Sequence, residues 1–375
     1  MNISLQFENG ENLVKALILA GGFGTRLRPI SCTRPKILFP IINKPLLQWT
    51  FERLAKNNIT EAILAVNYQT EVYIKQHKIP NCGLKIKYSR DPIKKPLGTG
   101  GPIKRAEKLL GYDSPFLVLN GDIFADLSYT EILKKHKEEK AVATIALHRV
   151  KDPSRYGVAE LAEDNKIKRF IEKPSLKDAP TNLINAGVYV LSPKVFDYIQ
   201  KGRNVSIELE IFPKLAIEGK LYGHVLEGLW MDIGKPEEYL EINKIMLNSI
   251  ENPQGGNAFP KVEVKNPVLF GKKVAIGEKS VIGPYAILGQ DVVVGKNVHI
   301  KESVVFPSAI IGDSSSINGA IIGEGVTIGK GVTIENGCII GDFVKINDNI
   351  SLAENVYVCP AKEIFQNILT SNCVI

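Results

Sequence analysis

The 375-residue sequence has little of what marks secreted, membrane or metal-cluster proteins. Its five cysteines are scattered without a Cys-x-x-Cys spacing, which argues against a disulfide framework and a zinc site and favours a reducing, cytoplasmic location. The sequence contains no run of about 18 apolar residues and no charged-then-apolar leader, so we expect neither a membrane span nor a secretion signal. The five histidines form no recognisable catalytic triad.

The net charge of +7 is modest and evenly spread. The densest basic group, at residues 134–140, is interrupted by Glu138 and Glu139 on a helical pattern, as is typical of a solvated helix face. No basic patch is interleaved with aromatic residues in the manner of a single-strand binding groove. We therefore expect no nucleic-acid partner, and we assign the excess positive charge to small polyanionic substrates and to solubility.

The first two-thirds of the chain alternates strand and helix patterns. Strands are predicted at residues 14–19, 61–66, 85–89, 115–119, 143–148 and 187–191, and helices at residues 46–57, 101–110, 128–139 and 235–250. Such alternation predicts a Rossmann-like α/β domain, with a mainly parallel sheet covered by helices on both faces. We place an N-terminal extension at residues 1–12 and this domain at residues 13–250.

The pattern changes near residue 260. From Phe270 onward an aliphatic residue followed by small or polar residues recurs every six positions, and between Ile300 and Ile328 the step twice shortens by one, which indicates loops or imperfect coils. A sandwich would not hold this phase, so the pattern predicts a left-handed parallel β-helix of hexapeptide repeats. We place a linker at residues 251–260, the β-helix at 261–360 and a tail at 361–375, which we expect to cap the solenoid.

One motif carries most of the chemistry. An apolar strand ending at Leu19 runs into a turn with Gly21, Gly22 and Gly24, followed by Arg26 and later by Lys36. Glycines without a Cβ let backbone N–H groups approach phosphate oxygens, while the two basic side chains supply positive charge. The alternative reading, an ordinary strand-to-helix connector, is weaker because the motif is long. The spacing fits neither the Walker motif nor the dinucleotide motif. A polyphosphate site is therefore predicted here.

The string from Leu19 to Pro45 resembles the signature of the nucleoside-diphosphate-sugar pyrophosphorylases, which are sugar-1-phosphate nucleotidyltransferases. The resemblance implies that Arg26 and Lys36 steady the triphosphate and the departing pyrophosphate. It also implies nucleotide contacts from Leu19, Ala20, Gly21, Gly22, Gly24 and Thr25.

Two aspartates are the candidate metal ligands. Asp122 ends an apolar run in the motif Asn120-Gly121-Asp122, and Asp232 lies in the apolar segment 230–234, where a charge needs a partner. Each alone also reads as a turn or helix-capping residue. Both match metal-binding aspartates of the resembled family, and hard oxygen ligands suit Mg²⁺.

Further segments resemble the family in the same order along the chain. Gly98 and Thr99 stand in the loop that lies against the base, and Gln69 stands where the family often has a base contact. The sugar side is expected to contain Gly157, Glu172, Lys173 and Asn185, with Lys173 holding the phosphate of the sugar 1-phosphate. The alternative for Glu172 and Lys173 is a surface ion pair before a proline.

The chain looks most similar to the mannose-1-phosphate guanylyltransferases, which implies GTP and mannose 1-phosphate as substrates. Gly100 stands where that group often has alanine, a difference near the base loop that bears on base selectivity. The alternative substrates are glucose 1-phosphate with a uridylyl, thymidylyl or adenylyl donor.

Two alternatives come from other classes of function. Hexapeptide solenoids often carry acyltransferase sites that use a histidine base, and His299 is the one histidine of the repeat. Relatives of the guanylyltransferases also include non-catalytic regulatory subunits, although the intact basic and acidic motif residues argue against that role here. We expect the β-helix to serve assembly into a homo-oligomer or regulation.

Overall fold

The structure is a computed structural model that describes residues 14–22, 24–92, 96–250, 259–371 and 373–374. The extension predicted at residues 1–12 and most of the predicted linker at 251–260 lie outside the described residues. The chain divides into two compact units. One contains the described residues up to Gly22 and Leu47–Trp230, and the other contains residues 24–46 and Met231 onward. The predicted domain limits stay predictions.

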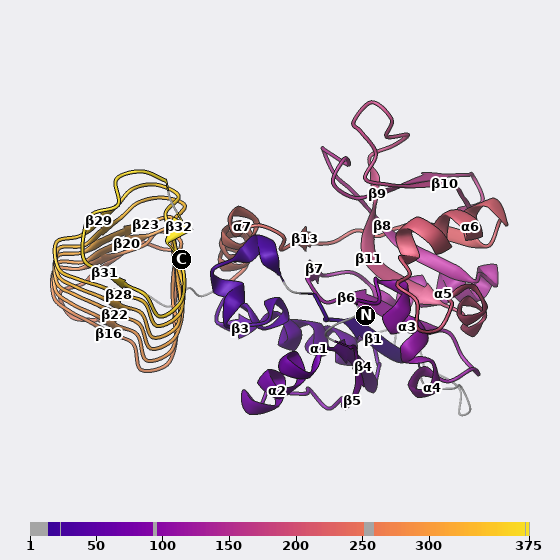
Figure 1. Ribbon diagram of the computed structural model, residues 1–375, viewed down its shortest axis with the longest axis horizontal. Helices are drawn as coiled ribbons and strands as arrows, with labels where there is room; N and C mark the ends of the chain where they lie inside the picture. The colour runs from indigo at the N-terminus through magenta and orange to yellow at the C-terminus, as the bar shows by residue number, and fades with distance from the viewer. Residues whose placement is uncertain (1–13, 23, 93–95, 251–258, 372, 375) are drawn as a thin grey trace, which may run out of the picture. The chain divides into compact units, whose positions relative to one another are not determined.

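The first unit is built on a nine-stranded sheet, whose main path runs β10-β9-β11-β6-β1-β4-β5, with β8 beside β11 and β12 beside β8 (Figure 1). Its strands are β1 (Lys15–Leu19), β4 (Glu61–Val66), β5 (Lys85–Arg90), β6 (Phe116–Asn120), β8 (Ala143–Arg149), β9 (Gly157–Leu161), β10 (Ile167–Glu172), β11 (Leu183–Leu191) and β12 (Leu221–Val225). All six predicted strands are present, and β9, β10 and β12 are additional.

The sheet is parallel where the sequence alternates strand and helix, from β1 through β4 to β5 and from β1 to β6. It turns antiparallel at β11, which pairs with β6, β8 and β9. A short turn joins β9 to β10, and such a turn permits only antiparallel pairing. The prediction of a mainly parallel sheet is therefore confirmed for the first half of the unit, and the second half is mixed.

Helices follow the parallel strands. They are α1 (Leu46–Lys56), α2 (Tyr68–Gln76), α3 (Gly100–Arg105), α4 (Glu107–Leu110), α5 (Tyr129–Glu139) and α6 (Phe212–Ile217), with a 3-10 helix η4 (Pro193–Tyr198) and a π-helix η5 (Ile207–Ile211). Ser128 caps α5 by accepting from the Glu131 N–H at 3.2 Å. The helix predicted at residues 101–110 is two pieces, because the Leu109 N–H bonds to the Ala106 carbonyl in a tighter turn.

A continuous apolar core fixes the sheet against its helices. Side chains of β1, β6 and β11 are fully buried together with those of α3, η4 and α6, among them Leu17, Val118, Tyr189, Ile103, Val195 and Phe212. Tyr189 and Phe212 meet edge to face, with ring centroids 5.1 Å apart. This core holds the carboxyl ends of the parallel strands at one edge, where ligands gather in open α/β sheets.

The second unit contains a solenoid of three parallel sheets, as expected for a left-handed β-helix (Figure 1). One sheet is β14 (Glu263–Val264), β17 (Val281–Ile282), β20 (His299–Lys301), β23 (Ser316–Asn318), β26 (Thr333–Ile334) and β29 (Ser351–Leu352). The next is β15 (Val268–Phe270), β18 (Ala286–Leu288), β21 (Val304–Val305), β24 (Ile321–Ile322), β27 (Ile339–Ile340), β30 (Tyr357–Val358) and β32 (Cys373–Val374). The third is β16 (Ala275–Ile276), β19 (Val293–Val294), β22 (Ile310–Ile311), β25 (Thr327–Ile328), β28 (Lys345–Ile346) and β31 (Glu363–Ile364).

From β14 to β31 each strand pairs with the third strand after it, so three hexapeptides close one coil, and β32 then pairs with β30. The aliphatic residues that carry the period are buried in a central column, for example Ile300, Ile317 and Ile334. Both shortened steps are corners between strands that still pair in register, with Ser303 and Ala320 buried at the turns. The irregularity therefore marks shortened coils and not loops.

The rest of the second unit packs around one helix, α7 (Pro236–Asn248), at the place predicted for residues 235–250. The segment 24–46 forms the 3-10 turns η1 (Thr25–Leu27), η2 (Ile30–Cys32) and η3 (Lys36–Leu38) and a small hairpin of β2 (Pro40–Ile41) and β3 (Lys44–Pro45). Phe39 from this segment, Tyr239 from α7 and Phe306 from the β-helix meet edge to face at centroid distances of 5.7 to 6.4 Å. Two short strands, β7 (Ile123–Ala125) and β13 (Trp230–Asp232), complete the chain. In the described part of the chain, no helix has the length and apolar character needed to cross a bilayer.

Candidate active site

Four parallel strands of the first unit end at one edge. The Gly121 N–H bonds to the Leu19 carbonyl at 2.9 Å, and the Ala20 N–H bonds to the Ala65 carbonyl at 2.9 Å, so the ends of β6, β1 and β4 are level. The Asp91 N–H reaches the Val66 carbonyl at 2.8 Å and brings the end of β5 into the same row. The predicted nucleotide residues Leu19, Ala20, Gly21 and Gly22 leave β1 here, and Asp122 follows β6.

Asp91 lies against the glycine-rich turn and was not among the residues predicted from the sequence. A Cβ added to Gly21 would stand 3.2 Å from Oδ2 of Asp91, whereas nothing lies within 4 Å of one added to Gly22. Oδ1 of Asp91 is buried without a hydrogen-bond partner. Burial raises the pKa of Asp91 to about 6, and the positive charge of Arg105 opposes the rise. An enclosed acceptor therefore faces the turn that the sequence assigns to nucleotide binding.

The neighbouring Arg90 is committed elsewhere, which explains why it does not neutralise Asp91. Its guanidinium binds Glu71 through two hydrogen bonds, of 2.6 and 3.1 Å. Glu71 is 2% exposed and also accepts from Lys75, at 2.6 Å. These two cations, Arg90 first, lower the pKa of Glu71 to about 2 against the effect of its burial.

The loop before α3 packs closely against the backbone of Val205. Gly98 has φ +70°, and a Cβ there would lie 2.3 Å from the Val205 carbonyl oxygen. The Thr99 hydroxyl donates to the Glu208 carboxylate and accepts from the Ile207 N–H at 2.9 Å. Thr99 therefore fixes the start of the π-helix η5, a kind of irregularity that is frequent at functional sites.

Gly100, which stands where the resembled group often has alanine, packs against Val205. A Cβ at this position would stand 3.1 Å from a methyl group of Val205 and 3.2 Å from its carbonyl oxygen. The residue thus faces packed protein.

The predicted sugar-side residues come together at the ends of β9 and β10. A Cβ on Gly157 would meet the Phe170 ring at 2.5 Å and Oε2 of Glu172 at 2.8 Å, so only glycine leaves room for that carboxylate. Desolvation and the nearby charge of Glu208 raise the pKa of Glu172. The exposed Lys173 ammonium stands 3.6 Å from Oε1 of Glu172.

Lys173 has a backbone conformation that is rare for a residue with a side chain. Its φ is +48°, and its N–H is tied to the Tyr156 carbonyl at 3.0 Å. Strain of this kind clusters at ligand sites. The backbone conformation of Lys173 therefore supports its predicted place in the sugar-phosphate site.

Asn185 shapes the sugar side through β11. Its side chain accepts from the Gly187 N–H at 2.8 Å and donates to the Tyr189 hydroxyl at 3.0 Å, where the register of β11 against β8 shifts. Trp230 braces the same bend, because its indole N–H donates to the Ala186 carbonyl at 2.9 Å. The Tyr156 ring meets the Trp230 ring edge to face at 5.5 Å.

The second unit holds the other half of the predicted residues. Gly24, with φ +57°, opens η1, which Thr25 begins, and its carbonyl accepts from the Ser31 hydroxyl at 2.7 Å. Arg26 is exposed on η1, and one of its guanidinium nitrogens lies 3.1 Å from where Gly234 would carry a Cβ. Glycine at 234 therefore lets Arg26 lie over the turn that follows Asp232.

Lys36 and Asp232 form an enclosed ion pair in the second unit. The distance from Nζ to Oδ1 is 3.7 Å, and the two side chains are 9% and 14% exposed. A cation and an anion held this way can be separated by a ligand that brings phosphate to the lysine and a metal to the carboxylate.

The residues fit a divalent metal of the kind predicted. No group of three or more His, Cys, Asp or Glu side chains able to hold a metal exists among the described residues. One or two carboxylates with substrate phosphates and waters are the set that Mg²⁺ normally takes, and Asp122 and Asp232 supply such carboxylates. Their joint role stays a proposal, because they belong to different compact units.

The remaining predicted residue, Gln69, is exposed in the first turn of α2. The side chain of Asn67 caps this helix by accepting a hydrogen bond from the Thr70 N–H at 2.8 Å. Two further candidates, Asp91 and Glu208, escaped prediction. Asp91 follows β5 directly, much as Asp122 comes two residues after β6, and that position was the available signal. Glu208 was not predicted because its relation to Thr99 is tertiary.

Comparison with protein families gives two matches. The family described as "Nucleotidyl transferase" matches residues 15–249, and the one described as "GMPPB C-terminal domain" matches residues 264–374. Together they span both sections of the sequence pattern.

Named relatives agree with one another. The chain is 42% identical over 245 residues to mannose-1-phosphate guanylyltransferase catalytic subunit beta of Dictyostelium discoideum, covering 64% of this chain and 67% of that protein. It is 43% identical over 251 residues to mannose-1-phosphate guanyltransferase beta-A of Xenopus laevis, covering 66% and 69%.

Solved structures match the first section. HddC from Yersinia pseudotuberculosis is similar with a TM-score of 0.54 at 31% identity, covering 62% of this chain and 100% of that chain, and a second crystal structure of it is complexed with GMP-PN. A UDP-glucose pyrophosphorylase complexed with UDP-glucose matches with a TM-score of 0.54 at 25% identity, covering 64% and 100%.

Proposed function

We propose, since the chain belongs to the nucleotidyl transferase family, that it joins GTP and mannose 1-phosphate into GDP-mannose and pyrophosphate. The observation that carries the choice of guanine is the Asp91 carboxylate, whose Oδ1 is buried without a hydrogen-bond partner and whose Oδ2 lies beside Gly21. Guanine presents two adjacent donors, its ring N1–H and its exocyclic amino group, and a carboxylate accepts both. Uracil and thymine offer one donor between two carbonyls, and adenine offers one beside an acceptor. The carboxylate therefore favours guanine.

The reaction needs no general base from the protein. The second pKa of a phosphate monoester is about 6, so the attacking phosphate oxygen is already ionised at neutral pH. The task is to bring two anions together in line and to neutralise charge on the phosphoryl oxygens. Lys173 holds the sugar phosphate, and Arg26 and Lys36 hold the triphosphate and then the pyrophosphate. These assignments explain why a chain without a recognisable histidine triad suffices.

The sugar is oriented by acceptors and donors of the first unit. Glu172 and Asn185 face the hydroxyls, with the Glu172 carboxyl as an acceptor and the Asn185 amide as both donor and acceptor. Magnesium bound by Asp122 and Asp232 would supply charge neutralisation at the reacting phosphates. The β-helix would join copies of the chain into a homo-oligomer.

The test is a grid of pyrophosphate release with Mg²⁺, in which GTP, ATP, UTP and dTTP are each paired with mannose 1-phosphate and glucose 1-phosphate. We expect GTP with mannose 1-phosphate to lead by at least about tenfold. Asp122→Asn should lower that rate by about 100-fold. A lead by another pair would replace the substrate assignment, and silence across the grid would favour the regulatory alternative.

A further inference from the structure

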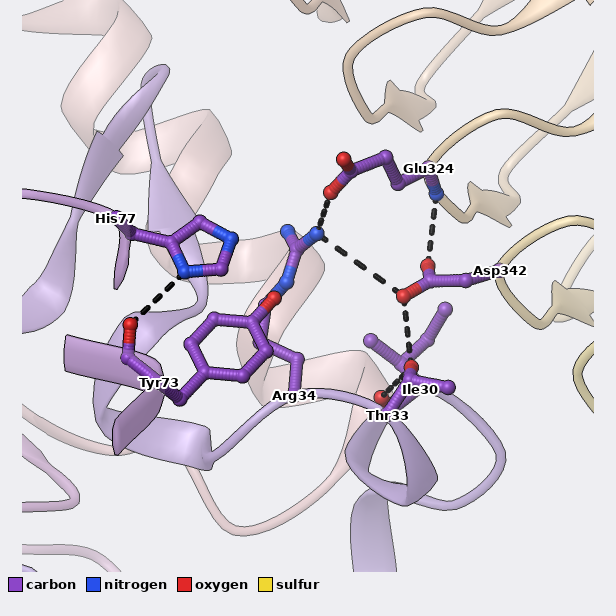
Figure 2. Close-up of polar contacts among 7 residues, drawn as sticks. All are labelled: Ile30, Thr33, Arg34, Tyr73, His77, Glu324 and Asp342. Atoms are coloured by element: carbon purple, nitrogen blue, oxygen red, sulfur yellow. Dashed lines mark hydrogen bonds and ion pairs between the residues drawn. The ribbon is translucent and has the colours of Figure 1, made fainter. Parts of the chain in front are cut away.

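The segment that carries Arg26 and Lys36 is held on the β-helix through Arg34. Figure 2 shows the Arg34 guanidinium between two carboxylates of the coils: it is paired with Glu324, and its Nη2 stands 4.0 Å from Oδ2 of Asp342. The Thr33 hydroxyl donates to the same Oδ2 at 2.7 Å. Arg34 is 7% exposed and Asp342 is 2% exposed, so these charges are out of water.

The two carboxylate oxygens of Asp342 make different contacts. Oδ1 accepts from the Glu324 N–H of the neighbouring coil at 2.7 Å. Asp313 and Asp348 make the same corner contact, to the N–H groups of Lys296 at 2.8 Å and Lys330 at 2.7 Å. The corner contact therefore recurs along the solenoid, whereas the hydrogen bond of Oδ2 with Thr33 and its ion pair with Arg34 are specific to Asp342.

Burial of Arg34 and Asp342 strengthens this attachment, while the Glu324 side chain is 34% exposed. A guanidinium out of water is tolerated only with charged partners, and removing one partner leaves an uncompensated charge. Arg34 also lies over the Phe306 ring, with Cζ 4.9 Å from its centroid. The other end of the segment is held as well, because the Asn43 amide donates to the Leu288 carbonyl at 3.0 Å.

Arg34 precedes Pro35 and Lys36, and Pro35 opens η3 with restricted backbone. We propose that Arg34, Glu324 and Asp342 form a positioning clamp through which the β-helix fixes the segment that presents Arg26 and Lys36 to the triphosphate. The roles of Arg26 and Lys36 rest on the proposed function, whereas the clamp itself does not. The β-helix then supports catalysis within one chain, besides any part in assembly.

The first test measures the clamp without turnover. Asp342→Asn keeps the Oδ1 acceptor of the corner and replaces Oδ2 by an uncharged amide nitrogen, which removes the acceptor of the Thr33 O–H and the negative charge beside Arg34. Asp348→Asn makes the same change at a corner remote from Arg34. In the full-length chain we expect amide hydrogen exchange over residues 24–39 to accelerate at least tenfold in Asp342→Asn and to stay within twofold in Asp348→Asn. Equal exchange in the two variants would overturn the clamp.

The second test separates positioning from general loss of structure. Asp342→Asn should raise KM for GTP five- to twentyfold, leave KM for mannose 1-phosphate within twofold, and keep a cooperative thermal transition. Arg34→Lys should be intermediate, because an ammonium keeps the charge but not the two-armed reach. A fall in kcat alone, or equal rises in both KM values, would contradict positioning. If the parent chain turns over no pair, the proposed function fails while the exchange experiment still decides the clamp.

Discussion

The ammonium group of Lys36 faces a carboxylate oxygen of Asp232 at 3.7 Å, with both side chains almost enclosed. Lys36 opens η3 and Asp232 ends β13, so distant parts of the sequence meet within one compact unit. Each charge compensates the other until substrate arrives. In the proposed reaction the triphosphate binds Lys36 and the metal binds Asp232. The ion pair is therefore replaced by contacts with the substrate and the metal.

Replacing either member should stop the reaction with little loss of fold. We expect Asp232→Asn and Lys36→Gln each to lower pyrophosphate release by about 100-fold or more, because preorganised charge supplies most of the stabilisation. The double variant should lose much less than the product of the two effects, since the residues act as a unit. Steady-state kinetics of the three variants beside Asp164→Asn, an exposed aspartate, make the measurement. Activity of Asp232→Asn equal to that control would contradict the role.

Asp91 should set the preference for guanine. We expect the parent chain to use GTP at least about tenfold better than ITP, whose base lacks the exocyclic amino group, and Asp91→Asn to reduce this ratio to about threefold. The same variant should raise Tm, because a neutral amide replaces a carboxyl whose burial penalises its charge. The exposed Asp113 provides the control substitution. An unchanged GTP to ITP ratio would remove Asp91 from base recognition.

The raised pKa of Asp91 also predicts how stability and GTP binding change with pH. The folded pKa of about 6 exceeds the ordinary 3.8, so the charged form costs stability progressively as pH rises from about 4 to 6. The Tm advantage of Asp91→Asn should therefore grow over this range and level off above it. KM for GTP of the parent should rise as pH falls below 6, since the protonated carboxyl loses an acceptor. A flat KM in the parent between pH 5 and 7 would contradict this prediction.

The sequence predicted well what depends on local period. The six-residue phase gave the β-helix with its two shortened corners, because an aliphatic side chain must return to the column once per side. The strands before the glycine-rich turn and before Asp122 were also predicted, since fully buried parallel strands read as apolar runs.

What the sequence did not predict depends on contacts between distant residues. Oδ1 of Asp91 has no hydrogen-bond partner while the adjacent Arg90 binds Glu71, and no spacing in the sequence predicts either arrangement. The antiparallel half of the sheet is set by β11, which pairs with β6, β8 and β9 across long sequence separations, and the short alternations of β9 and β10 were too weak to predict as strands. Arg34 sits inside the recognised motif, yet its partners lie in the β-helix, so its role required the folded chain.

Glu71 should govern acid stability of the first unit. Its folded pKa of about 2 lies below the ordinary 4.5, so the stability it contributes is present above about pH 4.5 and is lost as pH falls toward 2. Glu71→Gln should lower the free energy of unfolding at pH 7 by about 1–3 kcal/mol, because it weakens a buried charge-assisted pair. The gap between variant and parent should close on acidification. Urea unfolding at several pH values checks this, and a constant gap from pH 7 to 3 would contradict it.

Gly98 and Gly100 are two residues apart, and we expect substitution by alanine to lower stability strongly at Gly98 and little at Gly100. Gly98→Ala puts a Cβ into the Val205 carbonyl oxygen and forces a left-handed φ on alanine, so we expect a loss of at least about 2 kcal/mol and failure of the base loop. Gly100→Ala meets a methyl group of Val205 at 3.1 Å and its carbonyl oxygen at 3.2 Å, and Val205→Ala should relieve the first of these contacts. Its Tm should change little, and its GTP preference should stay within twofold of the parent, because the methyl faces packed protein. If Gly100→Ala instead shifts the nucleotide preference, the residue reads the base, and the assignment of selectivity to Asp91 would have to be shared with it.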